Sequence, residues 1–146
     1  MVRRGEGPQQ PLAPAVAVTG GTYAVAMTPD ELKACCLEQN EAWEDFPFPT
    51  YPGLSTFKVS GKIFALSALG ETPLSVSLKC DPEIAVRLRA SYPAVRPGWH
   101  LNKRHWNTVT LDGSLSDRTV REMVEDSYDL VVAGLPRWER LRLGQG

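Results

Sequence analysis

The chain has 146 residues, of which 42% are hydrophobic, so we expect one folded domain with a core of its own. A net charge of −1 excludes a uniformly basic nucleic-acid-binding protein, and no apolar run approaches the roughly 18 residues of a membrane span. The three cysteines fit neither a disulfide framework nor a zinc site, and no continuous apolar signal segment follows the first arginines, so we predict a cytoplasmic protein that does not associate with membranes.

Residues 1–26 are rich in Pro, Gly, Gln, Ala and Val, and they show neither helical nor strand periodicity. This composition is typical of disordered segments at the ends of domains. We therefore predict a disordered N-terminal tail over residues 1–26 and a folded domain over residues 27–140.

A helix is predicted directly after this tail. Thr28 is its expected N-cap, Pro29 is its first residue, and Glu31 lies three residues after the cap, which completes a capping box. Residues with helical spacing then form the stripe that should face the core. These residues are Leu32, Cys35, Cys36 and Gln39.

The middle of the chain has the pattern of antiparallel strands. Residues 42–53 carry four aromatic residues and three prolines, which predicts a short edge strand followed by an irregular loop. Residues 56–69 predict two strands joined by a tight turn at Ser60-Gly61. In residues 74–79 apolar residues alternate with Ser, Ser and Lys, so one face of the sheet should be buried and the other half open.

A second helix is predicted between Asp81, which caps it, and Pro93, which limits its end. Its expected inner face consists of Ile84, Leu88 and Tyr92, with Arg87 and Arg89 directed elsewhere.

After a loop at Pro97-Gly98, residues 105–111 predict a strand. A last helix follows, capped by Ser114 or Ser116 and ended by Gly134, with Pro136 confirming the stop. Because the strands form a run and the helices are set apart, the fold class is α+β, with an antiparallel sheet and N-terminal, middle and C-terminal helices.

Charge is distributed unevenly along the chain. Residues 28–54 hold six acidic residues and one basic residue, a net of −5, whereas residues 79–106 hold six basic and two acidic residues, a net of +4. The second segment includes RPGWHLNKRHWNTV, residues 96–109, with both histidines and two of the four tryptophans. DNA binding requires cations for phosphates, donors for base edges and often inserted side chains. The candidate DNA-binding residues are Arg96, His100, Asn102, Lys103, Arg104, His105 and Trp106, with Lys58, Lys62 and Lys79 extending the positive area across the sheet.

Metal binding and catalysis are weaker interpretations of the same stretch. His100 and His105 are five residues apart without a Cys, Asp or Glu between them, and two nitrogen ligands do not make a zinc site. Ser60-Gly61-Lys62 lacks the spacing of a phosphate-binding loop. Cys80 precedes a helix whose dipole would lower its pKa, although it also follows an apolar strand and fits a packed position. We expect no metal, no cofactor and no enzymatic activity.

The segments FKVSGKIFAL, VSLKCDPE, RPGWHLNKRHWNTV and SYDLVVAGL occur in the order and spacing of the MmcQ/YjbR family, so that residues 28–138 resemble this family. The resemblance implies a small α+β domain with a frataxin-like sheet, described as a double-wing DNA-binding motif. DNA is therefore the partner that we expect.

Two other roles for the stretch remain open. A small-molecule- or protein-binding module would use the aromatic residues as a pocket wall, and rings that line a concavity would favour it. Alternatively, Trp99, His105 and Asn102 serve only to hold the loop in place.

Overall fold

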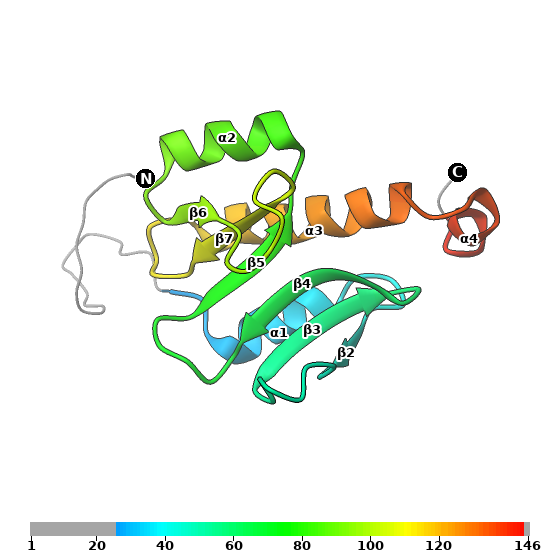
Figure 1. The fold of residues 1–146 in the computed structure, drawn as a ribbon, viewed down its shortest axis with the longest axis horizontal. Coiled ribbons are helices and arrows are strands. Elements are labelled where there is room, and N and C mark those ends of the chain that lie inside the picture. The colour runs from blue at the N-terminus through cyan, green and yellow to red at the C-terminus, as the bar shows by residue number, and fades with distance from the viewer. Residues whose placement is uncertain (1–25, 145–146) are drawn as a thin grey trace.

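The structure, a computed structural model, describes residues 26–144. The predicted disordered tail therefore lies outside the described residues, except for residue 26. In chain order the elements are α1 (Pro29–Leu37), β2 (Trp43–Asp45), β3 (Leu54–Val59), β4 (Lys62–Ala68), β5 (Ser75–Lys79), α2 (Pro82–Ser91), β6 (Val95–Pro97), β7 (Trp106–Thr110), α3 (Asp117–Ala133) and α4 (Arg137–Arg142) (Figure 1).

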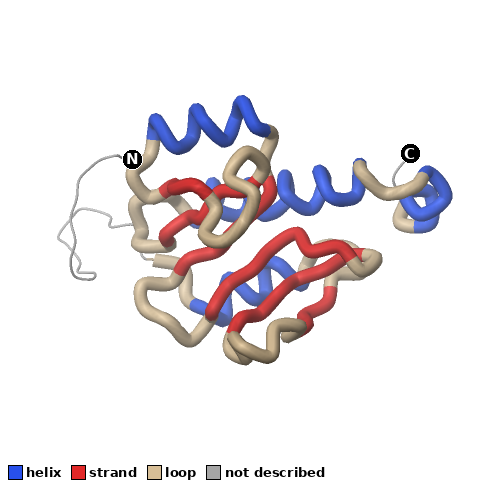
Figure 2. The backbone as a smooth tube through the Cα atoms, viewed as in Figure 1, coloured by secondary structure: helices blue, strands red, loops and turns tan. Residues whose placement is uncertain are grey.

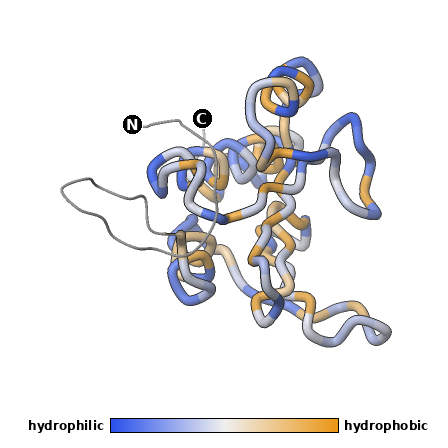
Figure 3. The backbone as a smooth tube through the Cα atoms, turned by 90° about the vertical axis from the view of Figure 1, so that its left-hand side faces the viewer, coloured by the Kyte–Doolittle hydropathy of each residue, from blue (hydrophilic) through white to orange (hydrophobic). Residues whose placement is uncertain are grey.

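The six strands form one sheet in the order β2-β3-β4-β5-β7-β6, and every neighbouring pair is antiparallel. Helices α1 and α3 lie behind the sheet in the view of Figure 1, and α2 lies along the β6–β7 end (Figure 2). The hydrophobic stretches gather toward the middle of the molecule, whereas the outer turns are more hydrophilic (Figure 3). This architecture confirms the predicted α+β class with an antiparallel sheet.

Local sequence signals account for several of these elements. The backbone N–H of Glu31 donates to Thr28 Oγ1 at 3.1 Å, and Thr28 N–H donates to Glu31 Oε1 at 2.8 Å, which is the predicted capping box. Ser60 and Gly61 have φ angles of 49° and 77°, the left-handed pair that a tight hairpin turn needs. Both predictions are therefore confirmed.

Ser127 of α3 joins the helix layer to the sheet where β4 and β5 separate. These strands pair over only two residue positions. Beyond them, the fully buried Ser127 hydroxyl donates to the carbonyl oxygen of Phe64 at 2.6 Å and accepts the N–H of Lys79 at 2.8 Å. One side chain thus satisfies two backbone groups that the sheet leaves unpaired.

Two short elements were not predicted. Residues 95–97 form the edge strand β6 rather than part of a loop, and Pro97 is tolerated there because an edge strand need not donate on both sides. Helix α4 begins immediately after Pro136, because a proline that ends one helix also suits the start of another.

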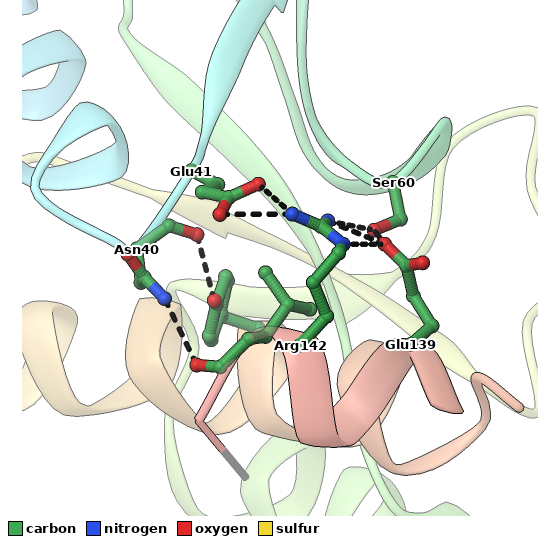
Figure 4. A network of polar contacts seen from close by, with 7 residues as sticks. Asn40, Glu41, Ser60, Glu139 and Arg142 are labelled. Carbon is green, nitrogen blue, oxygen red and sulfur yellow. Dashed lines mark hydrogen bonds and ion pairs between the residues drawn. The ribbon is translucent and has the colours of Figure 1, made fainter. Parts of the chain in front are cut away.

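A polar network holds α4 against the β3–β4 hairpin (Figure 4). Arg142 pairs with Glu41 at 2.9 Å and with Glu139, whose carboxylate also accepts the Ser60 hydroxyl. Asn40 Nδ2 donates to the Leu143 carbonyl at 3.0 Å. Leu143 is itself buried in the core, so the packed residues continue past the predicted boundary at residue 140.

The inner face predicted for α2 is wrong in part. Ala85 is the helix's buried residue, whereas Ile84 and Tyr92 are 43% and 40% exposed. The reason is that α2 lies over β6 and β7 at the end of the sheet, where the helix layer is incomplete.

Candidate nucleic-acid interface

The loop of residues 98–105, between β6 and β7, is folded by its own polar groups. Asn102 Oδ1 accepts the N–H of Arg104 at 2.9 Å, and the Asn102 backbone carbonyl accepts the N–H of Trp106 at 2.9 Å. Lys103 Nζ donates to the Gly98 carbonyl at 2.9 Å. Asn102 therefore has the turn-forming role that we considered for it.

Helix α2 is fastened to this loop by Arg89. Its Nη1 donates to the Lys103 carbonyl at 3.0 Å and to Asn107 Oδ1 on β7 at 2.8 Å. Arg89, which we predicted to point elsewhere than the inner face of α2, therefore contacts the loop and β7. A half-buried guanidinium with two acceptors positions the loop against the helix.

The result is a groove of about 760 Å³ between α2 and the loop, which we call the basic groove. Its charged lining residues are Glu83, Arg87, Arg89, Lys103 and Arg104. Four cations from two segments thus surround one carboxylate. Arg87 and Arg89 were not among the predicted DNA-binding residues, although both lie in residues 79–106, whose excess of positive charge could have identified them.

The aromatic part of the loop lies outside this groove. Trp99 is 57% exposed, and its ring makes edge contacts with Tyr51 at 6.2 Å and with His100 at 4.0 Å between centroids. Its backbone N–H donates to Thr108 Oγ1 at 3.1 Å. Neither Trp99 nor Trp106 lines the basic groove, so the rings do not form its wall.

Comparisons with known proteins place this fold in a family, because the sequence profile described as YjbR matches residues 37–130. The chain belongs to the YjbR family. YbdF of Escherichia coli O157:H7 is 35% identical over 99 residues, which cover 68% of this chain and 81% of YbdF. YjbR of Escherichia coli K12 is 46% identical over 88 residues, which cover 60% of this chain and 75% of YjbR. Both relatives are described as uncharacterised proteins.

Solved structures agree with this assignment to the YjbR family. The crystal structure of DR2400 from Deinococcus radiodurans, with a DUF419 domain, is 38% identical with a TM-score of 0.76, and the match covers 83% of this chain and 91% of that one. A crystal structure of a Pseudomonas syringae protein is 28% identical with a TM-score of 0.62, covering 71% and 98%. The predicted family and fold are therefore confirmed.

The other predicted basic residues of this YjbR domain are dispersed. Lys58 pairs with Asp45 at 2.7 Å and lies over the Trp43 ring, and this hydrogen bond lowers the pKa of Asp45. Lys58 is thus already neutralised. Lys62 lies at the β3–β4 turn, two strands away from β7 in the sheet order.

Three other residues that we predicted to bind DNA lie nearer the loop than Lys58 and Lys62 do. Lys79 is opposite Trp106 in the register of β5 and β7. Arg96 is exposed on β6, where its guanidinium reaches Thr110 Oγ1 at 3.5 Å. His105 holds β5 through its carbonyl, which accepts the Cys80 N–H at 2.8 Å.

Burial, followed by the nearby carboxylates of Asp81 and Asp126, raises the pKa of the Cys80 thiol. Of the two interpretations of Cys80, this direction favours the packed position. Across residues 26–144 no group of three His, Cys, Asp or Glu side chains is arranged to hold a metal ion. Within the same residues, no helix is long and apolar enough to cross a membrane.

Proposed function

We propose that this YjbR-family domain binds duplex DNA through the basic groove. The observation that carries the proposal is the convergence of four cationic side chains from α2 and the loop around one open groove. Phosphate oxygens are the groups that such clusters of guanidinium and ammonium donors recognise. In this proposal the domain binds DNA without catalysing a reaction, and it does so in the cytoplasm.

The cations contribute in different ways. Arg89 and Lys103 already donate to protein carbonyls, so part of their function is to shape the groove. Arg87 and Arg104 are exposed, and neither side chain forms an ion pair or hydrogen bond within the described residues. These two arginines are the phosphate contacts that we propose first.

The experiment is a salt titration of binding to a short random-sequence duplex, followed by fluorescence anisotropy. Each phosphate contact contributes about −0.9 to the slope of log K against log salt concentration. Arg87→Ala/Arg104→Ala should therefore flatten the slope by up to about two units without changing the melting temperature. Lys103→Ala is a poor test because it also removes the contact to the Gly98 carbonyl.

The matched control is Arg118→Ala/Arg137→Ala, which removes the same charge from exposed positions on α3 and α4. This control should keep the parent's affinity and slope. The proposal is refuted if the parent does not bind the duplex at low salt. It is also refuted if the two double variants lose affinity equally, because binding would then depend on net charge and not on the groove.

A further inference from the structure

A second cleft opens between α2 and α3, on the side of the sheet that the helices cover. Its floor is formed by Leu78, Asn107 and Val109 of β5 and β7, and its walls include Leu88 of α2 and Met123 of α3. It encloses about 480 Å³. Pockets for small molecules are typically about 300–1,000 Å³ and mostly apolar, so this cleft has the size and lining of such a site.

The cleft exists because the helix layer has a gap. Helix α3 covers β3, β4 and β5, whereas α2 covers β6 and β7, so the boundary between β5 and β7 lies under neither helix axis. Apolar side chains at the rim are left partly open, with Ile84 43% and Leu130 37% exposed. A ligand that covers this apolar surface removes it from water, which favours binding.

The rim of the cleft is acidic. Asp126 and Asp129 lie one turn apart on α3, and within residues 26–144 neither carboxylate has an ion-pair or hydrogen-bond partner. Burial, and then repulsion from Asp129 and Glu122, raises the pKa of Asp126. Lys79 is the basic residue among those lining the cleft, and strand alternation directs its side chain to the face opposite Leu78.

We propose that this cleft binds a small molecule with an apolar body and one positively charged amine. The apolar body would cover the floor between Leu78 and Leu88, and the ammonium group would lie at Asp126 and Asp129. The ammonium group of such a ligand would pair with these carboxylates, and its apolar body would cover the apolar side chains that the gap in the helix layer leaves open. The site does not depend on DNA binding, because the basic groove lies on the other side of α2 and has the opposite charge.

Three probes of equal chain length separate charge from hydrophobicity: n-octylammonium, n-octanol and n-octanoate. Binding is measured by calorimetry, and the site by amide chemical shifts on the full chain. We expect one saturable site, with shifts in α2 and α3, and an affinity order of octylammonium, octanol, octanoate. Salt should weaken octylammonium binding and leave octanol binding nearly unchanged.

Variants locate the charge contact. Asp126→Asn should weaken octylammonium binding roughly threefold, as expected for a rim-exposed ion pair, and should leave octanol binding unchanged. Glu125→Gln is the matched control, since it removes a carboxylate from the adjacent position of α3 that does not line the cleft. Ala133→Trp, at an exposed lining position, should fill the cleft and abolish binding of all three probes.

The proposal is overturned if the parent binds none of the probes saturably, or if octanoate binds as tightly as octylammonium. Equal effects of Asp126→Asn and Glu125→Gln would also overturn it. Parent-like binding by a folded Ala133→Trp variant would show that the probes bind elsewhere. None of these results bears on DNA binding by the basic groove.

Discussion

Replacing Ser127 by alanine should destabilise the domain far more than loss of one oxygen atom suggests. The hydroxyl is fully buried and bonds two backbone groups, the Phe64 carbonyl and the Lys79 N–H. These groups belong to β4 and β5, which no longer pair with each other at this point. Among residues 26–144, no strand is therefore positioned to replace the lost partner.

The expected cost follows from these two bonds. A buried polar group without a partner costs about 1–3 kcal/mol. Alanine recovers about 0.5 kcal/mol through its higher helix propensity. Two such groups, less the gain in helix propensity, give a fall of about 1.5–5.5 kcal/mol in the free energy of unfolding. For a domain of this size, 1 kcal/mol corresponds to roughly 4 °C, so the melting temperature should fall by roughly 6–22 °C.

The assay is urea denaturation, in which the midpoint should fall with little change in the m-value. Hydrogen exchange of the Lys79 amide supplies a local readout, because its N–H loses its acceptor. Ser91→Ala, at an exposed position near the end of α2, is the matched control and should change stability by less than about 0.5 kcal/mol. The reasoning is refuted if Ser127→Ala behaves like Ser91→Ala and Lys79 exchange is unchanged.

Two further predictions concern the α4 network and the loop. Arg142 and Ser60 hold the pKa of Glu139 below its ordinary value, so its stabilising effect is present above the unfolded pKa and is lost as pH falls through the folded pKa. Glu139→Gln should therefore lower the melting temperature at neutral pH, and the difference from the parent should shrink as pH falls below the ordinary glutamate pKa and disappear below the lowered pKa of Glu139; a difference that persists in strong acid would contradict this. Gly98→Ala should destabilise the domain by about 1–3 kcal/mol in denaturant titrations, because a Cβ there would lie 2.7 Å from the Cβ of Trp106; an unchanged midpoint would mean that the loop adjusts freely.

The sequence by itself determined the elements whose bonds form between near neighbours. Thr28 and Glu31 satisfy each other three residues apart, and Ser116 caps α3 by accepting the N–H of Thr119. Ser60-Gly61 closes its hairpin with its own backbone angles. Because each signal involves groups that any arrangement of the chain keeps close together, the elements and the α+β class could be predicted.

Tertiary structure decided the short elements. Helix α4 has six residues, too few to be stable alone in water, and it depends on Arg142 reaching Glu41 across 101 positions of the chain. Strand β6 has three residues and depends on β7 for its pairing. Neither element carries a strong local signal, because its stability comes from partners that only the complete fold brings close.

Tertiary structure also decided which predicted residues share a site. Strand register places Asp45 beside Lys58 and so neutralises a cation that the sequence made a candidate for DNA binding. Helix packing places Arg87 and Arg89 beside Lys103 and leaves the gap between α2 and α3. The chain order of the charges was visible in the sequence. The spatial neighbours of each charge could not be predicted from the sequence, because the pairing of side chains distant in sequence depends on the register of the strands and the placement of the helices.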